Sequence, residues 1–119
     1  MLDMNALRGF GIDTEEGMVY CAEDPEFYEE MIGEFASEGQ EKIAELQRFY
    51  DASDWKNYGI RTHAVKSTAR MIGAKGLSEK ARALEAASKA SEEVIVRDLH
   101  AEFINAYRTL LEQLEKALN

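Results

Sequence analysis

Apolar side chains recur at steps of three and four residues along four long stretches, and this spacing constrains the fold more than any other feature. One such stretch places Tyr58, Thr62, Val65, Ala69 and Ile72 on a single stripe. The spacing matches the turn of an α-helix and does not fit the two-residue period of a strand. It therefore predicts an amphipathic helix that buries one face.

Capping residues and glycines mark the ends of these helices. Asp24 is a good N-cap before Pro25 at the first helical position, and one long helix begins there and continues through Gly39. Gly73 ends the helix of the Tyr58 stripe, because glycine adopts the left-handed C′ conformation without a Cβ penalty. The expected helices cover residues 13–21, 25–50, 54–72 and 77–90, and a last helix with Ser91 as its N-cap continues to the C-terminus.

Short connections join the four long helices, and such connections place neighbouring helices antiparallel. We therefore expect an all-α fold, an up-down antiparallel four-helix bundle with a short extra N-terminal helix at one end. Residues 1–119 form a single domain in this interpretation. Residues 1–11 have weak periodicity and two glycines, and we expect them to form a loose arm.

The net charge of −9 is unevenly distributed along the chain. Residues 55–82 contain seven Lys or Arg and the single acid Glu79, whereas the rest of the chain carries a large excess of acids. An acidic body argues against binding to nucleic acid, which requires a basic surface. A local basic patch instead suits a partner that carries clustered carboxylates or a phosphoryl group.

The cysteine content and the hydropathy limit where the protein works. Cys21 is the single cysteine, so an internal disulfide is excluded and a reducing compartment is expected. The sequence has no apolar run of about 18 residues that would span a bilayer. Its first residues include Asp3 and lack the apolar core of a secretion signal. We expect a cytoplasmic monomer that does not contact a membrane.

His63 lies on the outward face of the helix expected over residues 54–72. At roughly 100° per residue, the imidazole falls on the order of 140° from the middle of the apolar stripe. The same face carries Lys56, Gly59, Ile60, Ser67 and Arg70, with Lys66 and Met71 on its flanks. We therefore expect the ring to be exposed to solvent among cations and small side chains.

The turn near residue 74 suggests a partner for this ring. If the two helices fold back antiparallel around that residue, His63 lies level with Glu85. A carboxylate there can accept a hydrogen bond from Nδ1–H, which fixes the tautomer and leaves Nε2 free as a nucleophile. Glu85 as an ordinary surface acid is the alternative, and the sequence leaves both interpretations open.

The sequence around this histidine reads His63-Ala64-Val65-Lys66-Ser67-Thr68-Ala69-Arg70-Met71-Ile72-Gly73, and Leu77 and Leu84-Glu85 follow it. It resembles the signature of histidine-containing phosphotransfer (HPt) domains, the four-helix bundles of two-component phosphorelays. That pattern is a histidine, a lysine three residues later, small residues, and a glycine that ends the helix. Val65 replaces the usual leucine, and Ser67 stands where glycine is commoner.

The resemblance implies that His63 accepts a phosphoryl group from a receiver aspartyl phosphate and passes it to a response-regulator aspartate. Phosphoryl transfer requires mainly positioning and charge compensation from a protein. We expect Lys66 and Arg70 to supply charge, although solvated bases on an exposed face are the ordinary alternative. The expected partner-binding surface consists of Lys56, Gly59, Ile60, Ala64, Ser67 and Met71, in which Ser67 keeps the surface low and Ile60, Ala64 and Met71 form an apolar rim.

The implied partners are a response-regulator receiver domain and a hybrid histidine kinase, and the receiver would supply the aspartate and Mg²⁺. We expect no cofactor and no metal site of the protein's own, since its two histidines and single cysteine lie far apart. A glycine-rich nucleotide loop is also absent from the sequence, so the phosphoryl donor must be another protein. The protein is therefore expected to be a phosphoryl carrier, not an enzyme.

Two alternatives remain open at this point. Instead of a phosphorelay carrier, the protein could be the phosphoacceptor module of a chemotaxis-type kinase, loaded from ATP by a separate domain. The other alternative is a helical adaptor without phosphoryl chemistry. The remaining chemically distinctive residues are interpreted structurally. His100 is expected to be a partly buried packing residue, Trp55, Tyr58 and Phe103 are expected in the core, and Cys21 is expected to be inert.

Overall fold

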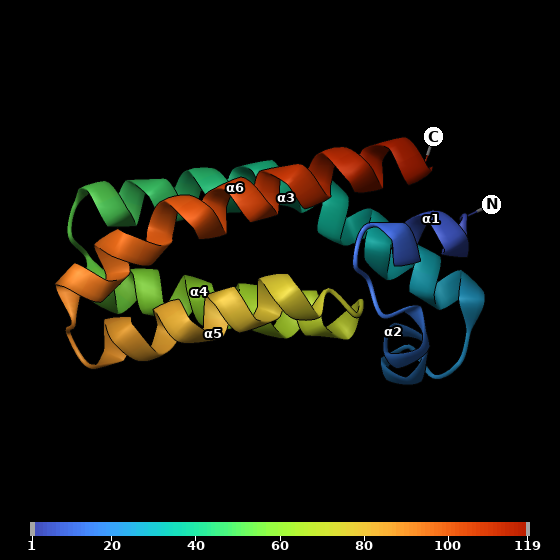
Figure 1. Ribbon diagram of the computed structural model, residues 1–119, viewed down its shortest axis with the longest axis horizontal. Helices are drawn as coiled ribbons and strands as arrows, with labels where there is room; N and C mark the ends of the chain where they lie inside the picture. The colour runs from blue at the N-terminus through green and yellow to red at the C-terminus, as the bar shows by residue number, and fades with distance from the viewer. Residues whose placement is uncertain (1, 119) are drawn as a thin grey trace.

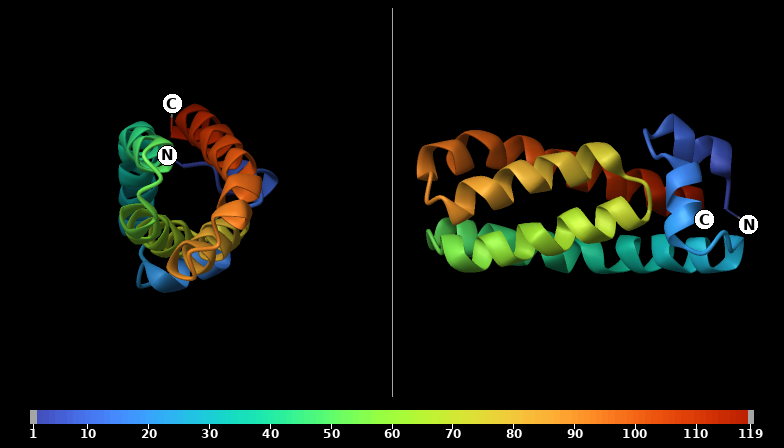
Figure 2. Two further views of the ribbon diagram at one scale, coloured as in Figure 1. Left: turned by 90° about the vertical axis from the view of Figure 1, so that its left-hand side faces the viewer. Right: turned by 90° about the horizontal axis from the view of Figure 1, so that it is seen from below.

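The computed structural model describes residues 2–118; Met1 and Asn119 lie outside the described part. Within that part the chain forms six α-helices and no strand (Figure 1). The four long helices are α3 (Pro25–Asp51), α4 (Trp55–Met71), α5 (Lys75–Lys89) and α6 (Glu93–Leu118). Each packs against the next, and α6 returns to α3, so that they surround a common core (Figure 2). The predicted all-α, up-down four-helix bundle is confirmed.

Two short helices, α1 (Met4–Gly9) and α2 (Thr14–Tyr20), lie at the end of the bundle where α4 turns into α5 (Figure 1). The structure corrects the loose arm that we expected over residues 1–11, apart from Met1, which is not described. The Asp3 carboxylate accepts hydrogen bonds from the amides of Asn5 and Ala6, which caps α1. Leu7 of α1 is completely buried in the core, and this burial holds the helix against the bundle.

The apolar stripes predicted from the sequence face the core. The buried stripe of α3 consists of Tyr28, Ile32, Phe35, Gly39, Ile43 and Leu46. Gly39 permits a close approach of α6, because a Cβ at this position would lie only 2.4 Å from the side chain of Leu111. The helix is continuous through this glycine, as expected. Among residues 2–118, no helix is both long enough and apolar enough to cross a membrane.

The turn between α4 and α5 fixes how these two helices align. Gly73 has a φ of +85°, the left-handed conformation that the sequence predicted for it. Its carbonyl accepts a hydrogen bond of 2.8 Å from the amide of Asp13, which ties the turn to α2. Helix α5 begins at Lys75, two residues before the expected Leu77, so Gly76 is helical. The turn is therefore short, and it leaves little freedom in the register of α4 against α5.

His100 lies in a buried polar cluster that joins three of the long helices. The side-chain oxygen Oε1 of Gln47 lies 3.0 Å from Nε2, which therefore carries the ring proton, and Nδ1 accepts a hydrogen bond of 2.7 Å from the Tyr58 hydroxyl. Burial lowers the pKa of His100, so the neutral ring is favoured. The ring also stacks on Tyr50 at 3.7 Å. The prediction that His100 is a packing residue is confirmed.

Candidate functional site

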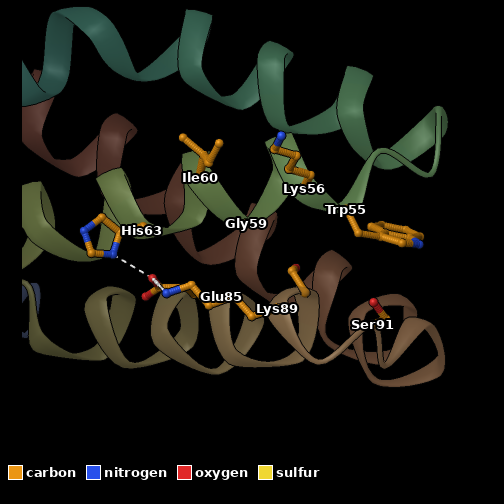
Figure 3. Close-up of a pocket in the computed structure, with 9 residues that line it drawn as sticks. Trp55, Lys56, Gly59, Ile60, His63, Glu85, Lys89 and Ser91 are labelled. Atoms are coloured by element: carbon orange, nitrogen blue, oxygen red, sulfur yellow. Dashed lines mark hydrogen bonds and ion pairs between the residues drawn. The ribbon is translucent and has the colours of Figure 1, made fainter.

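His63 projects from α4 on the side away from the core, and 57% of its side chain is exposed. Its Nδ1 lies 2.6 Å from Oε2 of Glu85 on α5. Figure 3 shows the ring and the carboxylate facing each other across the groove between the two helices. The register set by the turn at Gly73 thus brings together the two residues that the sequence placed at one level.

Glu85 is a buried carboxylate with several donors, and its side chain is only 6% exposed. Lys66 Nζ lies 2.7 Å from Oε1, while His63 Nδ1 and Lys89 Nζ, at 3.0 Å, share Oε2. Burial opposes ionisation, but the hydrogen bonds from Lys66, Lys89 and His63 outweigh it and lower the pKa of Glu85 to about 2. The interpretation of Glu85 as an ordinary surface acid is therefore wrong.

The charge of Glu85 determines the state of the imidazole. An ionised carboxylate only accepts hydrogen bonds, so the proton in the short contact with His63 belongs to Nδ1. The neutral ring then carries its lone pair on Nε2. In Figure 3 this second ring nitrogen points away from Glu85 and Lys89, toward the Met71 end of α4. The site therefore exposes at the surface of the bundle a ring nitrogen whose lone pair, in the neutral tautomer, can act as a nucleophile.

Glu85→Gln is expected to remove a stabilising contribution that depends on pH. The folded-state pKa of Glu85 is depressed to about 2, so its ion pairs stabilise the fold above the unfolded value of 4.5 and are lost as the pH falls through 2. Wild type should be more stable than the variant by up to about 3 kcal/mol at pH 7, and the two should converge near pH 2. Urea unfolding of both proteins across this range measures the difference.

The control for this experiment is Glu38→Gln, which removes the carboxylate of a largely exposed pair with Lys42 on α3. Such surface pairs contribute little, so this variant should follow wild type at every pH. If the stability of Glu85→Gln also followed that of wild type at every pH, this result would contradict the ion-pair arrangement around Glu85.

Two grooves with different linings flank His63. The first, shown in Figure 3, is lined by Trp55, Lys56, Gly59, Ile60, Ser88, Lys89 and Ser91, together with His63 and Glu85. The second is lined by Glu16, Lys66, Ser67, Arg70, Lys75, Ser78, Glu79 and Arg82. The first groove is mainly apolar and the second is rich in cations. His63 thus stands between an apolar surface and a basic surface.

Most residues expected around His63 lie where the sequence placed them. Lys56, Ile60 and Ser67 are exposed, and Ala64 and Met71 are half-buried. Gly59 is a correction, because it is buried at the floor of the first groove. A Cβ there would lie 3.2 Å from the Ser88 side chain on α5. The angular spacing along the helix placed Gly59 away from the core, but it could not show that α5 covers this side of α4.

Arg70 is exposed but is held away from His63. Its Nε donates a hydrogen bond of 3.0 Å to the hydroxyl of Tyr20, and its guanidinium lies 5.7 Å from the centre of that ring. Arg70 lies two helical turns beyond His63 on α4, and these contacts hold its side chain against α2. The structure therefore brings Lys66 to Glu85, but it does not bring Arg70 to the imidazole.

Lys89 is the site residue that the sequence reasoning missed. It follows Glu85 by one helical turn on α5, and its Nζ lies 3.0 Å from Oε2. The signal was present, because an acid and a lysine four residues apart on a helix commonly form a pair. Trp55 also differs from its expected place in the core, since it is only partly buried and lines the first groove.

Comparison with known proteins agrees with this geometry. A family model described as "Hpt domain" matches residues 30–117, which cover α4, α5 and nearly all of α3 and α6. Searches of curated proteins and of solved structures gave no match. Within the described residues there is no cluster of three or more His, Cys, Asp or Glu side chains that would hold a metal ion. The chain belongs to the HPt domain family, whose members serve histidine phosphotransfer in two-component systems.

Proposed function

We propose that this protein carries phosphoryl groups in a two-component phosphorelay and that His63 is the phosphoacceptor. In this function His63 takes the phosphoryl group from the aspartyl phosphate of one receiver domain and passes it to the aspartate of a response regulator. The observation that supports the proposal most is the pairing of an exposed imidazole with a buried, ionised carboxylate. The pairing holds Nδ1 and leaves Nε2 accessible to another protein.

The transfer step follows from this arrangement. The lone pair of Nε2 attacks phosphorus, the bond between phosphorus and the aspartyl oxygen breaks, and the aspartate leaves as a carboxylate. The proton on Nδ1 stays in its hydrogen bond to Glu85, so the phosphorylated ring carries a positive charge. Glu85 stabilises that charge, because its low pKa keeps it ionised. Attack by a second aspartate on the same phosphorus reverses the step.

Charge compensation and docking are divided between the two surfaces beside His63. Lys66 lies one turn beyond His63, toward the end of α4 to which Nε2 points, and its partly exposed amino group can turn from Glu85 to a phosphoryl oxygen. On the other side Ile60 is 53% exposed beside the apolar groove. A receiver that covers this surface would exclude water from the transfer and would supply the Mg²⁺ that phosphoryl transfer between these domains requires.

Lys66→Ala is expected to slow phosphoryl transfer about tenfold and to leave folding nearly intact. The lysine supplies a charge-assisted contact to the phosphoryl group in the transition state, whereas Glu85 keeps its ion pair with Lys89 when Lys66 is removed. Single-turnover transfer from a phosphorylated receiver measures the rate, and urea unfolding measures the stability. Lys42→Ala on α3 is the control. A large loss of stability with an unchanged rate would make Lys66 structural.

The proposal is tested by incubating the protein with a panel of receiver domains labelled with radioactive acetyl phosphate and Mg²⁺. The label should move to this protein, should be stable in base and labile in acid, and should map to His63 by mass spectrometry. Labelling from ATP through a kinase domain, with no labelling from any receiver, would instead favour the phosphoacceptor module of a chemotaxis-type kinase. If neither donor labels the protein, the remaining interpretation is a helical adaptor without phosphoryl chemistry.

A further inference from the structure

Lys89 shares a carboxylate oxygen with the phosphoacceptor. Its Nζ lies 3.0 Å from Oε2 of Glu85, the same oxygen that accepts the hydrogen bond of 2.6 Å from His63 Nδ1. Lys66 instead occupies Oε1. In Figure 3 Lys89 lies on the groove side of Glu85, whereas the second ring nitrogen of His63 points the other way. Lys89 therefore faces the ring through Glu85 and lies away from the nitrogen that would bear the phosphoryl group.

The charge of the ring changes when Nε2 accepts an electrophile. Because Nδ1 keeps its proton, the ring is neutral before the step and positive after it. Glu85 and Lys89 face the ring from α5, and Lys66 and Lys56 lie on α4. Figure 3 shows the amino group of Lys56 directed away from Glu85, so Lys89 is the nearer cation on the groove side. Its charge repels the positive ring, whose Nδ1 shares Oε2 with it, more than it attracts the phosphoryl oxygens, which would lie on the far side of the ring. Its bond to Oε2 also weakens the hydrogen bond that Glu85 accepts from Nδ1.

Given the proposed function, we infer that Lys89 is a positioning residue that keeps the phosphorylated ring ready to give up its phosphoryl group. It acts by sharing Oε2 of Glu85 with Nδ1 and by placing a positive charge beside a ring that becomes positive. The phosphorylated form is thereby held at a higher free energy than Glu85 alone would allow. A carrier needs such a balance, since a phosphoryl group that is bound too firmly is not passed on.

Lys66 and Lys89 differ in the sign of their effects. Lys66 lies toward the end of α4 to which Nε2 points, so it attracts the phosphoryl oxygens and favours the phosphorylated form. Lys89 lies on the opposite side and acts on the ring, so it disfavours that form. Two lysines on one carboxylate would thus shift the same equilibrium in opposite directions, a pattern that a merely structural role would not produce.

The equilibrium is measured with phosphoramidate as a small phosphoryl donor, at a fixed ratio of phosphoramidate to ammonium. In this exchange the phosphorus–nitrogen bond of the donor breaks, ammonia leaves, and the bond to Nε2 forms. The ratio of phosphorylated to free His63 should rise roughly threefold in Lys89→Met and fall by a similar factor in Lys66→Met, as expected for partly screened charges. Lys89→Arg should restore the wild-type ratio. Lys80→Met, which removes an α5 lysine paired with Glu102, is the control.

A second measurement does not depend on phosphoryl transfer. Oε2 of Glu85 is no longer shared in Lys89→Met, so the hydrogen bond from His63 Nδ1–H to this oxygen should become stronger and the NMR signal of that proton should lie further downfield than in wild type. An unchanged or lower ratio, with an unchanged proton signal, in Lys89→Met would overturn the role of Lys89. Wild type that takes no phosphoryl group at His63, together with the shifted proton signal in Lys89→Met, would instead sustain the sharing of Oε2 and contradict the proposed function.

Discussion

His63→Gln is expected to reduce phosphoryl uptake to background, a loss of at least a thousandfold, while the bundle remains folded. Glutamine is similar in size but has no nucleophilic nitrogen, because the lone pair of its amide nitrogen is delocalised. Stability should change by less than about 1 kcal/mol, since the ring is largely exposed and Lys89 and Lys66 still pair with Glu85. The initial rate of labelling from a phosphorylated receiver measures uptake, and urea unfolding measures stability.

Arg61→Gln is the matched control for this substitution. Arg61 is exposed on α4 two residues before His63, and its Nε lies 3.2 Å from Oε1 of Glu45 on α3, outside the surface expected to bind a partner. This variant should take up label at nearly the wild-type rate. His100 is the second histidine of the chain, but it is buried with both ring nitrogens hydrogen-bonded and is not accessible for labelling. Equal labelling of His63→Gln and wild type would therefore remove His63 from the mechanism.

The register of the site could be predicted from the sequence because it depends on few variables. Two helices that share the same rise per residue stay level along their length once the turn between them is located. Gly73 located that turn, and the pairing of His63 with Glu85 followed from counting. The burial of Glu85 was not predictable in this way, because it depends on how closely α4 and α5 pack.

The parts that were not predicted depend on contacts between distant segments. Helix α1 is held by the burial of Leu7, and its six residues are too few to show a stripe. Arg70 is positioned by Tyr20, fifty residues earlier in the chain. Gly59 lies on the exposed side of the core stripe, yet Ser88 of α5 covers it. The periodicity of apolar residues shows only which face of a helix packs on the core. Each of these features depends on contact with another segment, which the periodicity does not reveal.

The full set of donors around Glu85 could not be predicted from the sequence either. A buried carboxylate is destabilising unless it is paired, and Glu85 is stabilised only because three donors converge on it. Two of these donors come from the His63 helix and one from its own helix. The sequence identified His63 as a partner of Glu85 and Lys66 as a nearby cation, but it did not single out Lys89.

Gly73→Ala is expected to destabilise the fold by about 3 kcal/mol or more, because the added methyl group combines backbone strain with a clash. The residue has a φ of +85°, which is strained for any side chain. A Cβ at this position would also lie 2.1 Å from the carbonyl oxygen of Asp13, and backbone atoms cannot move aside as a flexible side chain can. The amide of Asp13 donates to the carbonyl of Gly73, so relieving the clash breaks this link between α2 and the turn.

Gly76→Ala provides the matched control, three residues away in the first turn of α5. A Cβ at Gly76 would point into open space among the described residues, and alanine is the better helix former, so this variant should gain about 0.5–1 kcal/mol. Urea unfolding at pH 7 compares the two with wild type. Gly73→Ala should also slow phosphoryl uptake, because a shifted turn moves Glu85 out of register with His63. Equal stability of Gly73→Ala and wild type would contradict the turn geometry on which the alignment of these two residues depends.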